Sequence, residues 1–184
     1  MKEITSGFLE TIGTNPDIIE KFERHFPKGG TLKSVLLVLD REERIPILYH
    51  LRNLLDGINL DGAEMSLSNL NRADLFEASL LRTDISSSDL IKADLRKANL
   101  SGSNLKRTKL RGAYMMLSIM IGTNLERADL EGVNLRGANL TNANLSGSNL
   151  HGACLYQTEF RNTNLRGAYL GYIVNNSWMP LIHI

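Results

Sequence analysis

The 184-residue chain is poor in cysteine, in excess charge and in long apolar segments. Its single cysteine, Cys154, excludes an intramolecular disulfide, a CxxC redox pair and the thiol spacing of a zinc site. Lysine plus arginine exceed aspartate plus glutamate by one, so the net charge gives no general attraction to nucleic acid or to an anionic membrane. The apolar segment Tyr114 to Ile121 is far too short to span a bilayer, and the first residues lack the apolar run of a secretory signal. These absences predict a cytoplasmic protein.

A strict five-residue repeat is the main positive feature of the sequence. A large apolar residue stands at every fifth position from Leu60 to Leu170, twenty-three in all, and eighteen of them are leucine. The other five are Met65, Ile85, Met115, Met120 and Phe160. Two residues before each of these central residues stands a small one, with Ile58 and Val133 as the only bulkier exceptions.

A period of five fits neither regular element. On an α-helix, five residues advance by about 500°, so successive leucines would lie about 140° apart and form no common stripe. On a straight strand, an odd spacing sends alternate leucines to opposite faces. A chain that bends in one sense after every short extended segment instead points each leucine inward. The period therefore predicts that the chain coils.

Glycine, aspartate and asparagine each recur at a fixed position within the five-residue repeat, called the phase below. Nine glycines, such as Gly102, stand two residues after a central residue, which fits the positive-φ position of a type II turn. Asp and Asn interchange at the residue before the central one, as at Asp74 and Asn69, so we expect their side chains to bond backbone groups near the turn. Cys154 has this same phase and is expected to be a surface replacement rather than a nucleophile.

The quintets ADLEG, VNLRG, ANLTN, ANLSG and SNLHG, which run from Ala128 to Gly152, resemble the A(D/N)LXX unit of pentapeptide repeat proteins. The resemblance covers residues 58–172. It implies an all-β solenoid, a right-handed quadrilateral β-helix with four repeats per coil and about six coils, or a rod about 28 Å long. Between Tyr114 and Ile121 the unit is not kept, because Tyr and Ile replace the usual Asn or Asp, and a local bulge is one expectation there.

Residues 1–57 lack the five-residue period and carry helix signals instead. Because a β-helix exposes strand edges and leucines at its ends, we expect these residues to form an N-terminal α-helical capping domain. The tail, residues 173–184, is expected to cover the opposite end or the equivalent end of a partner. Three expected helices begin at typical helix-initiating residues, which are Asn15-Pro16, Thr31 and Pro46.

The sequence offers little catalytic chemistry. The four histidines form no HExxH or comparable metal spacing, and a coil packed with leucine leaves no interior space for a substrate. We expect no catalytic residue, no metal and no cofactor. An enzyme would need a groove between residues 1–57 and the rod, and it ranks third among the hypotheses. The histidines are His25, His50, His151 and His183.

With four repeats per coil, residues twenty apart stack on one face, so the exterior can be mapped from the sequence. An exposed apolar zone is typical of an interaction surface, and we predict that the one found here binds a protein partner or a second copy in a homodimer. The alternative is that residues 1–57 or a displaced loop cover it. The zone consists of Phe76, Leu81, Tyr114, Met116, Leu117, Ile119, Ile121 and Tyr156.

A basic girdle is the second candidate surface. The mapping scatters its members over all four faces with acidic residues between them, which favours a solvated girdle over a phosphate-binding track. Its members are Arg82, Lys92, Arg96, Lys97, Lys106, Arg107, Lys109 and Arg111.

Two functions are preferred to an enzyme. The leading hypothesis is a non-catalytic scaffold or protein-interaction module, and the alternative is nucleic-acid binding through the basic girdle. The resemblance also raises a less favoured function, since some pentapeptide repeat proteins protect DNA gyrase by imitating DNA with an acidic rod. The repeat region here has thirteen basic and eleven acidic side chains, which is the wrong sign for such a mimic.

Overall fold

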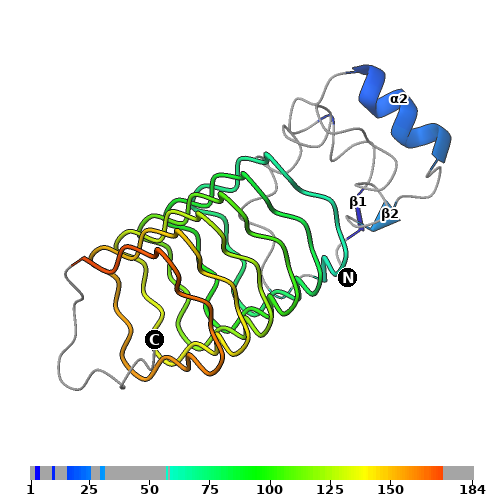
Figure 1. Cartoon of the computed structure of the whole chain (residues 1–184). Coiled ribbons are helices and arrows are strands. Elements are labelled where there is room, and N and C mark those ends of the chain that lie inside the picture. The colour runs from blue at the N-terminus through cyan, green and yellow to red at the C-terminus, as the bar shows by residue number, and fades with distance from the viewer. Residues whose placement is uncertain are drawn as a thin grey trace.

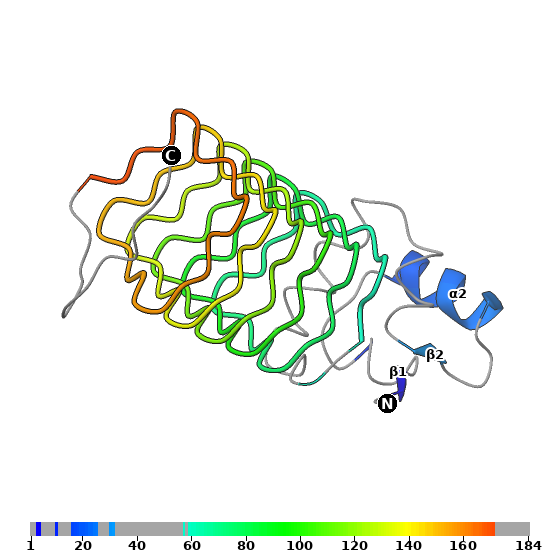
Figure 2. The same ribbon diagram turned by 60° about the horizontal axis from the view of Figure 1, so that its bottom comes forward.

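The computed structural model describes residues 3–4, 10, 16–25, 30–31, 57 and 59–171. Residues 59–171 form a continuous β-helix whose coils stack along one axis (Figures 1 and 2). Parallel bridges join residues twenty apart, from Asn59 with Ser79 to Asn149 with Tyr169, and recur at every fifth residue. A coil of twenty residues with a bridge every five has four sides.

The central residues of the quintets fill the interior. Every central residue from Leu60 to Leu155 has an exposed fraction of 2% or less, and that of Leu130 is 0%. In the last described coil, Phe160 and Leu165 are only partly buried, because no described coil lies beyond them. The inward direction of the central residues, predicted from the period, is confirmed.

Each corner of the rod is a tight turn. The Ala143 N–H donates to the Leu140 carbonyl at 2.9 Å, and Asn142 between them has a φ of 60°. Gly102, at the same phase, has a φ of 66°, as the glycine phase predicted. Thirteen residues other than glycine also adopt a φ of 54–60° at this phase, which glycine placement alone did not indicate. The left-handed region costs such residues about 1–2 kcal/mol each, so the packing and bonding of the coil must outweigh that cost.

Buried hydroxyl groups are satisfied inside the rod. Serine and threonine stand at several of the small inward positions, and their side chains are almost fully buried. Thr83 Oγ1 donates to the Leu60 carbonyl at 2.9 Å, and Thr123 Oγ1 donates to the Leu100 carbonyl at 2.8 Å. These bonds let a polar side chain occupy an otherwise apolar column without an unsatisfied group.

The phase of Asn and Asp follows from the backbone hydrogen bonds of one quintet. In residues 140–144, four of the five N–H groups donate to backbone carbonyls, three of them in neighbouring coils and one within the turn. The fifth, the N–H of Thr141, donates to Asn139 Oδ1 at 2.9 Å. An Asn or Asp before the central residue therefore accepts the one backbone N–H that the coil leaves over. This confirms the structural role expected for these side chains.

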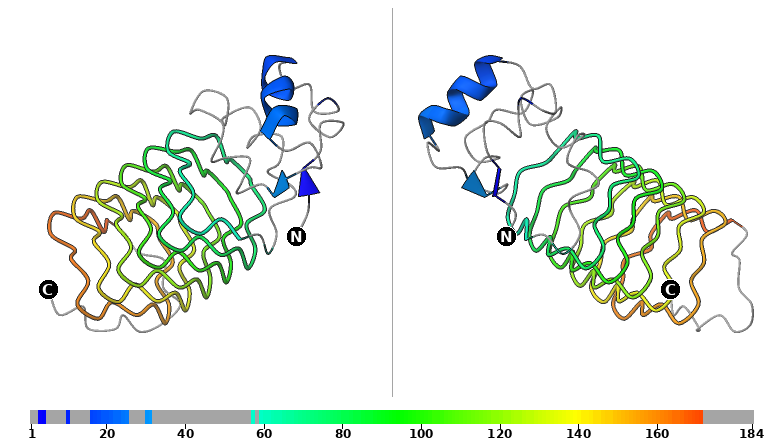
Figure 3. Two further views of the ribbon diagram at one scale, coloured as in Figure 1. Left: turned by 90° about the vertical axis from the view of Figure 1, so that its right-hand side faces the viewer. Right: turned by 180° about the vertical axis from the view of Figure 1, so that it is seen from behind.

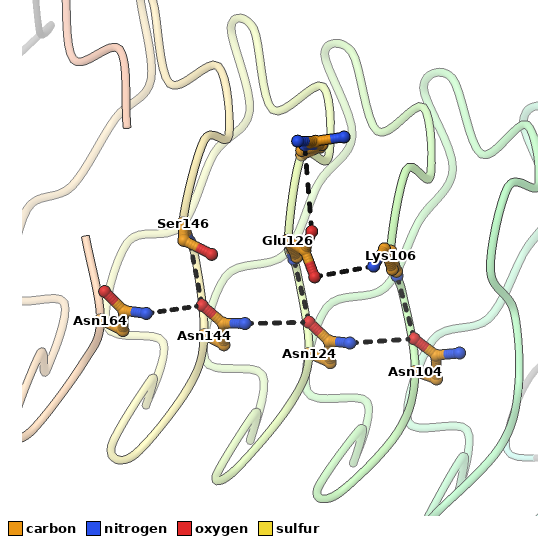
Figure 4. A network of polar contacts seen from close by, with 8 residues as sticks. Asn104, Lys106, Asn124, Glu126, Asn144, Ser146 and Asn164 are labelled. Carbon is orange, nitrogen blue, oxygen red and sulfur yellow. Dashed lines mark hydrogen bonds and ion pairs between the residues drawn. The ribbon is translucent and has the colours of Figure 1, made fainter. Parts of the chain in front are cut away.

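Asparagines on one side of the rod also bond to each other (Figure 4). The amide of Asn164 donates to Asn144 Oδ1 at 3.0 Å, and the amide of Asn144 donates to Asn124 Oδ1 at 3.4 Å. The row continues through Asn104 to Asp84. Each member thus links two coils in addition to its bond within the quintet.

The described part of residues 1–57 contains one helix and one strand pair. Helix α2 spans Pro16–His25, as predicted from the Asn15-Pro16 signal, with Asp17 in its first turn and an ion pair of 2.9 Å between Arg24 and Glu20. Strands β1 (Glu3–Ile4) and β2 (Gly30–Thr31) pair antiparallel, which the sequence did not indicate. The helices expected to follow Thr31 and Pro46, and the tail 173–184, lie outside the described residues.

Replacing a central leucine should destabilise the rod strongly. For Leu130→Ala, we expect the free energy of unfolding to fall by about 2–5 kcal/mol, because a large buried side chain leaves a cavity. Chemical denaturation followed by circular dichroism measures this loss. The control is Ser146→Ala on the outer surface, which should change stability by less than about 0.5 kcal/mol. Equal losses for the two variants would contradict an inward Leu130.

Two substitutions of Asn144 separate its bond to the backbone from its bonds along the row. Asn144→Ala removes the acceptor for the Ser146 N–H and should cost about 1–2 kcal/mol. Asn144→Asp keeps that acceptor and loses only the amide donor toward Asn124, so its cost should be smaller. Denaturation of both variants tests this order. If the aspartate variant were as unstable as the alanine variant, the backbone bond would not be the main role of this phase.

Candidate interaction surface

Five apolar side chains cross one corner of the rod within a single coil: Tyr114, Met116, Leu117, Ile119 and Ile121, called the apolar corner below. Tyr114 and Met116 lie on one side of the rod, Leu117 lies on the turn, and the two isoleucines lie on the next side. The exposed fraction is 50% for Tyr114, 58% for Leu117 and 41% for each isoleucine, whereas Met116 is half-buried. Large apolar side chains thus meet solvent on both sides of one turn.

The coil that carries the apolar corner keeps the regular register. Tyr114 is bridged to Asp94 in the preceding coil and to Asn134 in the following one, and Ile119 is bridged in the same way. The bulge that the sequence left open does not occur in residues 59–171. The apolar corner is therefore a feature of side chains on an unaltered backbone.

The other three predicted members of the apolar zone lie apart from this corner. Phe76 and Tyr156 are half-buried, and an arginine lies over each ring: Arg96 Cζ is 5.3 Å from the Phe76 centroid, and Arg136 Cζ is 5.3 Å from the Tyr156 centroid. Leu81 is half-buried too and lies two coils from the isoleucines. The structure thus brings five of the eight predicted residues together.

Two exposed apolar residues were missed by the sequence mapping. Leu67 is 39% exposed on a turn, and Tyr169 is 60% exposed at the residue before a central leucine. Both stand at positions of the repeat whose side chains point outward, so inspecting every such position in the sequence would have identified them. The Tyr169 ring stacks on His151 with a centroid distance of 5.8 Å. Neither residue adjoins the apolar corner.

The apolar corner costs the fold two hydrogen bonds. Tyr114 and Ile119 have the phase of the usual Asn or Asp, and neither side chain can accept the N–H two residues further on. No described residue accepts a hydrogen bond from the N–H of Met116 or Ile121. Each such bond is worth about 1 kcal/mol, and the exposed side chains gain little burial in return. A local departure without a packing gain is typical of a functional surface.

The polar neighbours of the apolar corner differ between its two sides. Arg96 and Arg136 lie one coil to either side of Met116, and Arg96 forms an ion pair with Asp94. The hydrogen bond from the Arg96 guanidinium lowers the pKa of Asp94, and the carboxylate in turn raises the pKa of Arg96. On the other side, the neighbours of the isoleucines are uncharged, namely Asn99, Ser101, Asn139 and Thr141.

Ion pairs neutralise most of the predicted basic girdle. Four of them join neighbouring coils, which are Lys97–Glu77 at 2.9 Å, Lys109–Asp89 at 2.9 Å, Lys106–Glu126 at 2.8 Å and Arg111–Glu131 at 2.6 Å. Lys106 also lowers the pKa of Glu126 by donating a hydrogen bond to its carboxylate (Figure 4). Of the girdle, Arg82, Lys92 and Arg107 have no ion pair within the described residues, and they lie at three different corners. They form no continuous cationic track.

The described residues hold no group of three or more His, Cys, Asp or Glu side chains that could bind a metal ion. Among those same residues, no helix is long and apolar enough to cross a membrane. Cys154 is half-buried with a free thiol, at the outward phase predicted for it.

Several solved structures are similar to this chain. A pentapeptide repeat protein from the cyanobacterium Cyanothece 51142 is 26% identical, with 70% of this chain and 94% of that chain covered and a TM-score of 0.42. One from Nostoc PCC 7120 is 22% identical, with coverages of 68% and 93% and a TM-score of 0.49. The plasmid-mediated fluoroquinolone resistance protein QnrB1 is 17% identical, with coverages of 65% and 78% and a TM-score of 0.42. No curated protein sequence matches this chain.

The sequence also matches the family model of pentapeptide repeats, with eight copies. The matched residues are 54–90, 78–115 and 123–162, which together make up more than half of the chain. The quintets in these stretches form the four-sided coils described above. The chain therefore belongs to the pentapeptide repeat family and folds as a right-handed quadrilateral β-helix.

Proposed function

We propose that the protein is a non-catalytic scaffold whose apolar corner binds a protein partner. The observation that carries this proposal is the set of large apolar side chains exposed on both sides of one turn. The backbone beneath them is held by hydrogen bonds to the coils before and after it. A backbone held in this way has little conformational entropy to lose on binding.

The proposed architecture is a rod of about six coils, capped by residues 1–57 at one end and by the tail 173–184 at the other. In support of the coil number, bridges along one side connect six residues from Asn59 to Glu159. In support of the cap, α2 lies beyond the first coil in Figure 1, and Ile19 packs against the buried core.

Catalysis is not part of this proposal. The acidic residues before the central leucines accept backbone N–H groups, as Asp74 and Asp84 do, and are thereby committed to the fold. Several of the other charged residues form ion pairs between coils. The described surface therefore supports binding better than it supports acid, base or nucleophilic chemistry.

Nucleic-acid binding through the basic girdle is the alternative function. It is favoured by the concentration of basic residues in two coils and disfavoured by their ion pairs with neighbouring coils. It predicts salt-sensitive binding in the micromolar range or tighter to duplex or single strands. We expect a flat titration at low salt with fluorescent DNA and RNA of both kinds. Salt-sensitive binding in that titration would favour the alternative over the scaffold.

A double variant tests the proposed function without unfolding the protein. Tyr114→Asn with Ile119→Asn removes two exposed apolar side chains and supplies the missing acceptors for the N–H groups of Met116 and Ile121. We expect thermal stability to be unchanged or raised, because each new bond is worth about 1 kcal/mol. Capture of a protein partner from lysate of the native organism should be lost.

The control for this experiment is Ser146→Ala, a surface replacement on another side of the rod, which should leave capture intact. Capture of the same protein at the same yield by the double variant and by the unsubstituted chain would contradict the proposed surface.

A further inference from the structure

The shape of the apolar corner restricts the kind of partner that can cover it. Its side chains straddle a turn of a four-sided rod, and the turns form ridges along the length of the rod (Figure 3). Tyr114 projects from one side of the ridge and Ile119 from the other, with Leu117 between them. A flat partner, including one side of a second copy of this rod, covers one side of the ridge and leaves the other exposed.

The crest of the ridge, Leu117, is supported by the next coil. Leu117 has a φ of 59° and is the most exposed member of the apolar corner. Its side chain leans onto the next coil at Gly137, where a Cβ atom would lie 2.8 Å from Leu117 Cδ2. Because that corner is a glycine, the leucine can rest against backbone atoms. This contact restricts the Leu117 side chain before a partner binds, which favours tight binding.

The charge around the ridge is asymmetric. Beside Met116, Arg136 lies over the Tyr156 ring and forms no ion pair with the described residues, so its positive charge is not neutralised. Arg96, on the opposite side of Met116, is paired with Asp94. The isoleucine side has only uncharged neighbours. An interface complementary to this pattern has a carboxylate near Arg136 and neutral groups next to the isoleucines.

Building on the proposed function, we propose that the partner is a protein with a concave apolar cleft that receives Leu117. An acidic side chain on one rim of that cleft faces Arg136. The cleft encloses both sides of the ridge, so that Tyr114 and the isoleucines contact opposite walls.

The test begins with the full-length chain carrying the photoreactive amino acid p-benzoylphenylalanine in place of Tyr114. Irradiation in lysate of the native organism crosslinks the bound protein, and mass spectrometry identifies it. That protein is then purified, and its affinity for the unsubstituted full-length chain and for variants is measured by isothermal titration calorimetry at two salt concentrations. Circular dichroism establishes that each variant is folded.

Two matched pairs of variants test the position of Leu117 and the charge of Arg136. Gly137→Ala displaces the Leu117 side chain, whereas Gly102→Ala has the same φ of 66° and meets Arg82 Cγ only at an ordinary 3.5 Å. We expect affinity to fall about tenfold for Gly137→Ala and to be unchanged for Gly102→Ala. Arg136→Glu should weaken binding about tenfold and reduce its salt dependence, while Arg166→Glu, in the last described coil on another side, should do neither.

The remaining outcomes overturn the proposal. Equal effects within each pair would show that neither the position of Leu117 nor the charge of Arg136 matters. A crosslink only to a second copy of the chain, or binding only to vesicles of anionic phospholipid, would show that the apolar corner binds that copy or that membrane and not a protein with a cleft. If capture depends on the apolar corner while the two variants of each matched pair behave alike, the proposed function is supported and the proposed cleft is contradicted. If capture does not depend on the apolar corner, both proposals are contradicted.

Discussion

The fold depends on a set of backbone hydrogen bonds that most quintets repeat. In residues 140–144, four of the five N–H groups donate to carbonyls of the turn and of the neighbouring coils, and Asn139 accepts the fifth. This arrangement holds only if the large central side chain points inward and the residue two positions later adopts a positive φ. The core and the hydrogen bonds therefore require each other, which explains why the period is kept without an insertion.

The same arrangement explains how much could be predicted. The burial of Leu130, the turn at Gly102 and the backbone role of Asn139 each repeat in every coil, and a repeated local rule can be recognised in the sequence. The positive φ of Asn142 could not be recognised, because its side chain does not demand that conformation. The geometry of the surrounding coils imposes it.

Surface contacts were predicted less well than the core. Stacking residues twenty apart placed Phe76 and Tyr156 in an apolar zone. This mapping gives the side of the rod on which a residue lies, but not the direction of its side chain. Arginines one coil away lie over both rings. The ion pairs of the basic girdle were missed for the same reason, since long side chains reach across coils in directions that sequence position does not determine. The five residues of the apolar corner do lie together, because they follow one another along a single coil.

The apolar corner departs from the Asn or Asp phase that most quintets keep. Tyr114 and Ile119 lack the acceptor that an Asn or Asp supplies there, and they remain exposed. The regular backbone tolerates this loss because the coils on either side keep their bonds. A rigid repeat thereby supplies a foundation on which a few outward residues vary, which separates binding from folding.

Oxidative footprinting of the full-length protein tests most directly whether the apolar corner faces solvent. Three neighbouring methionines provide an internal comparison, because Met115 and Met120 are fully buried and Met116 is half-buried. Hydroxyl radicals should modify Tyr114, Met116 and Leu117 rapidly and leave Met115 and Met120 protected. Protection of Tyr114 and Leu117 to the same degree as Met115 would show that another part of the chain covers this surface, and would contradict the account.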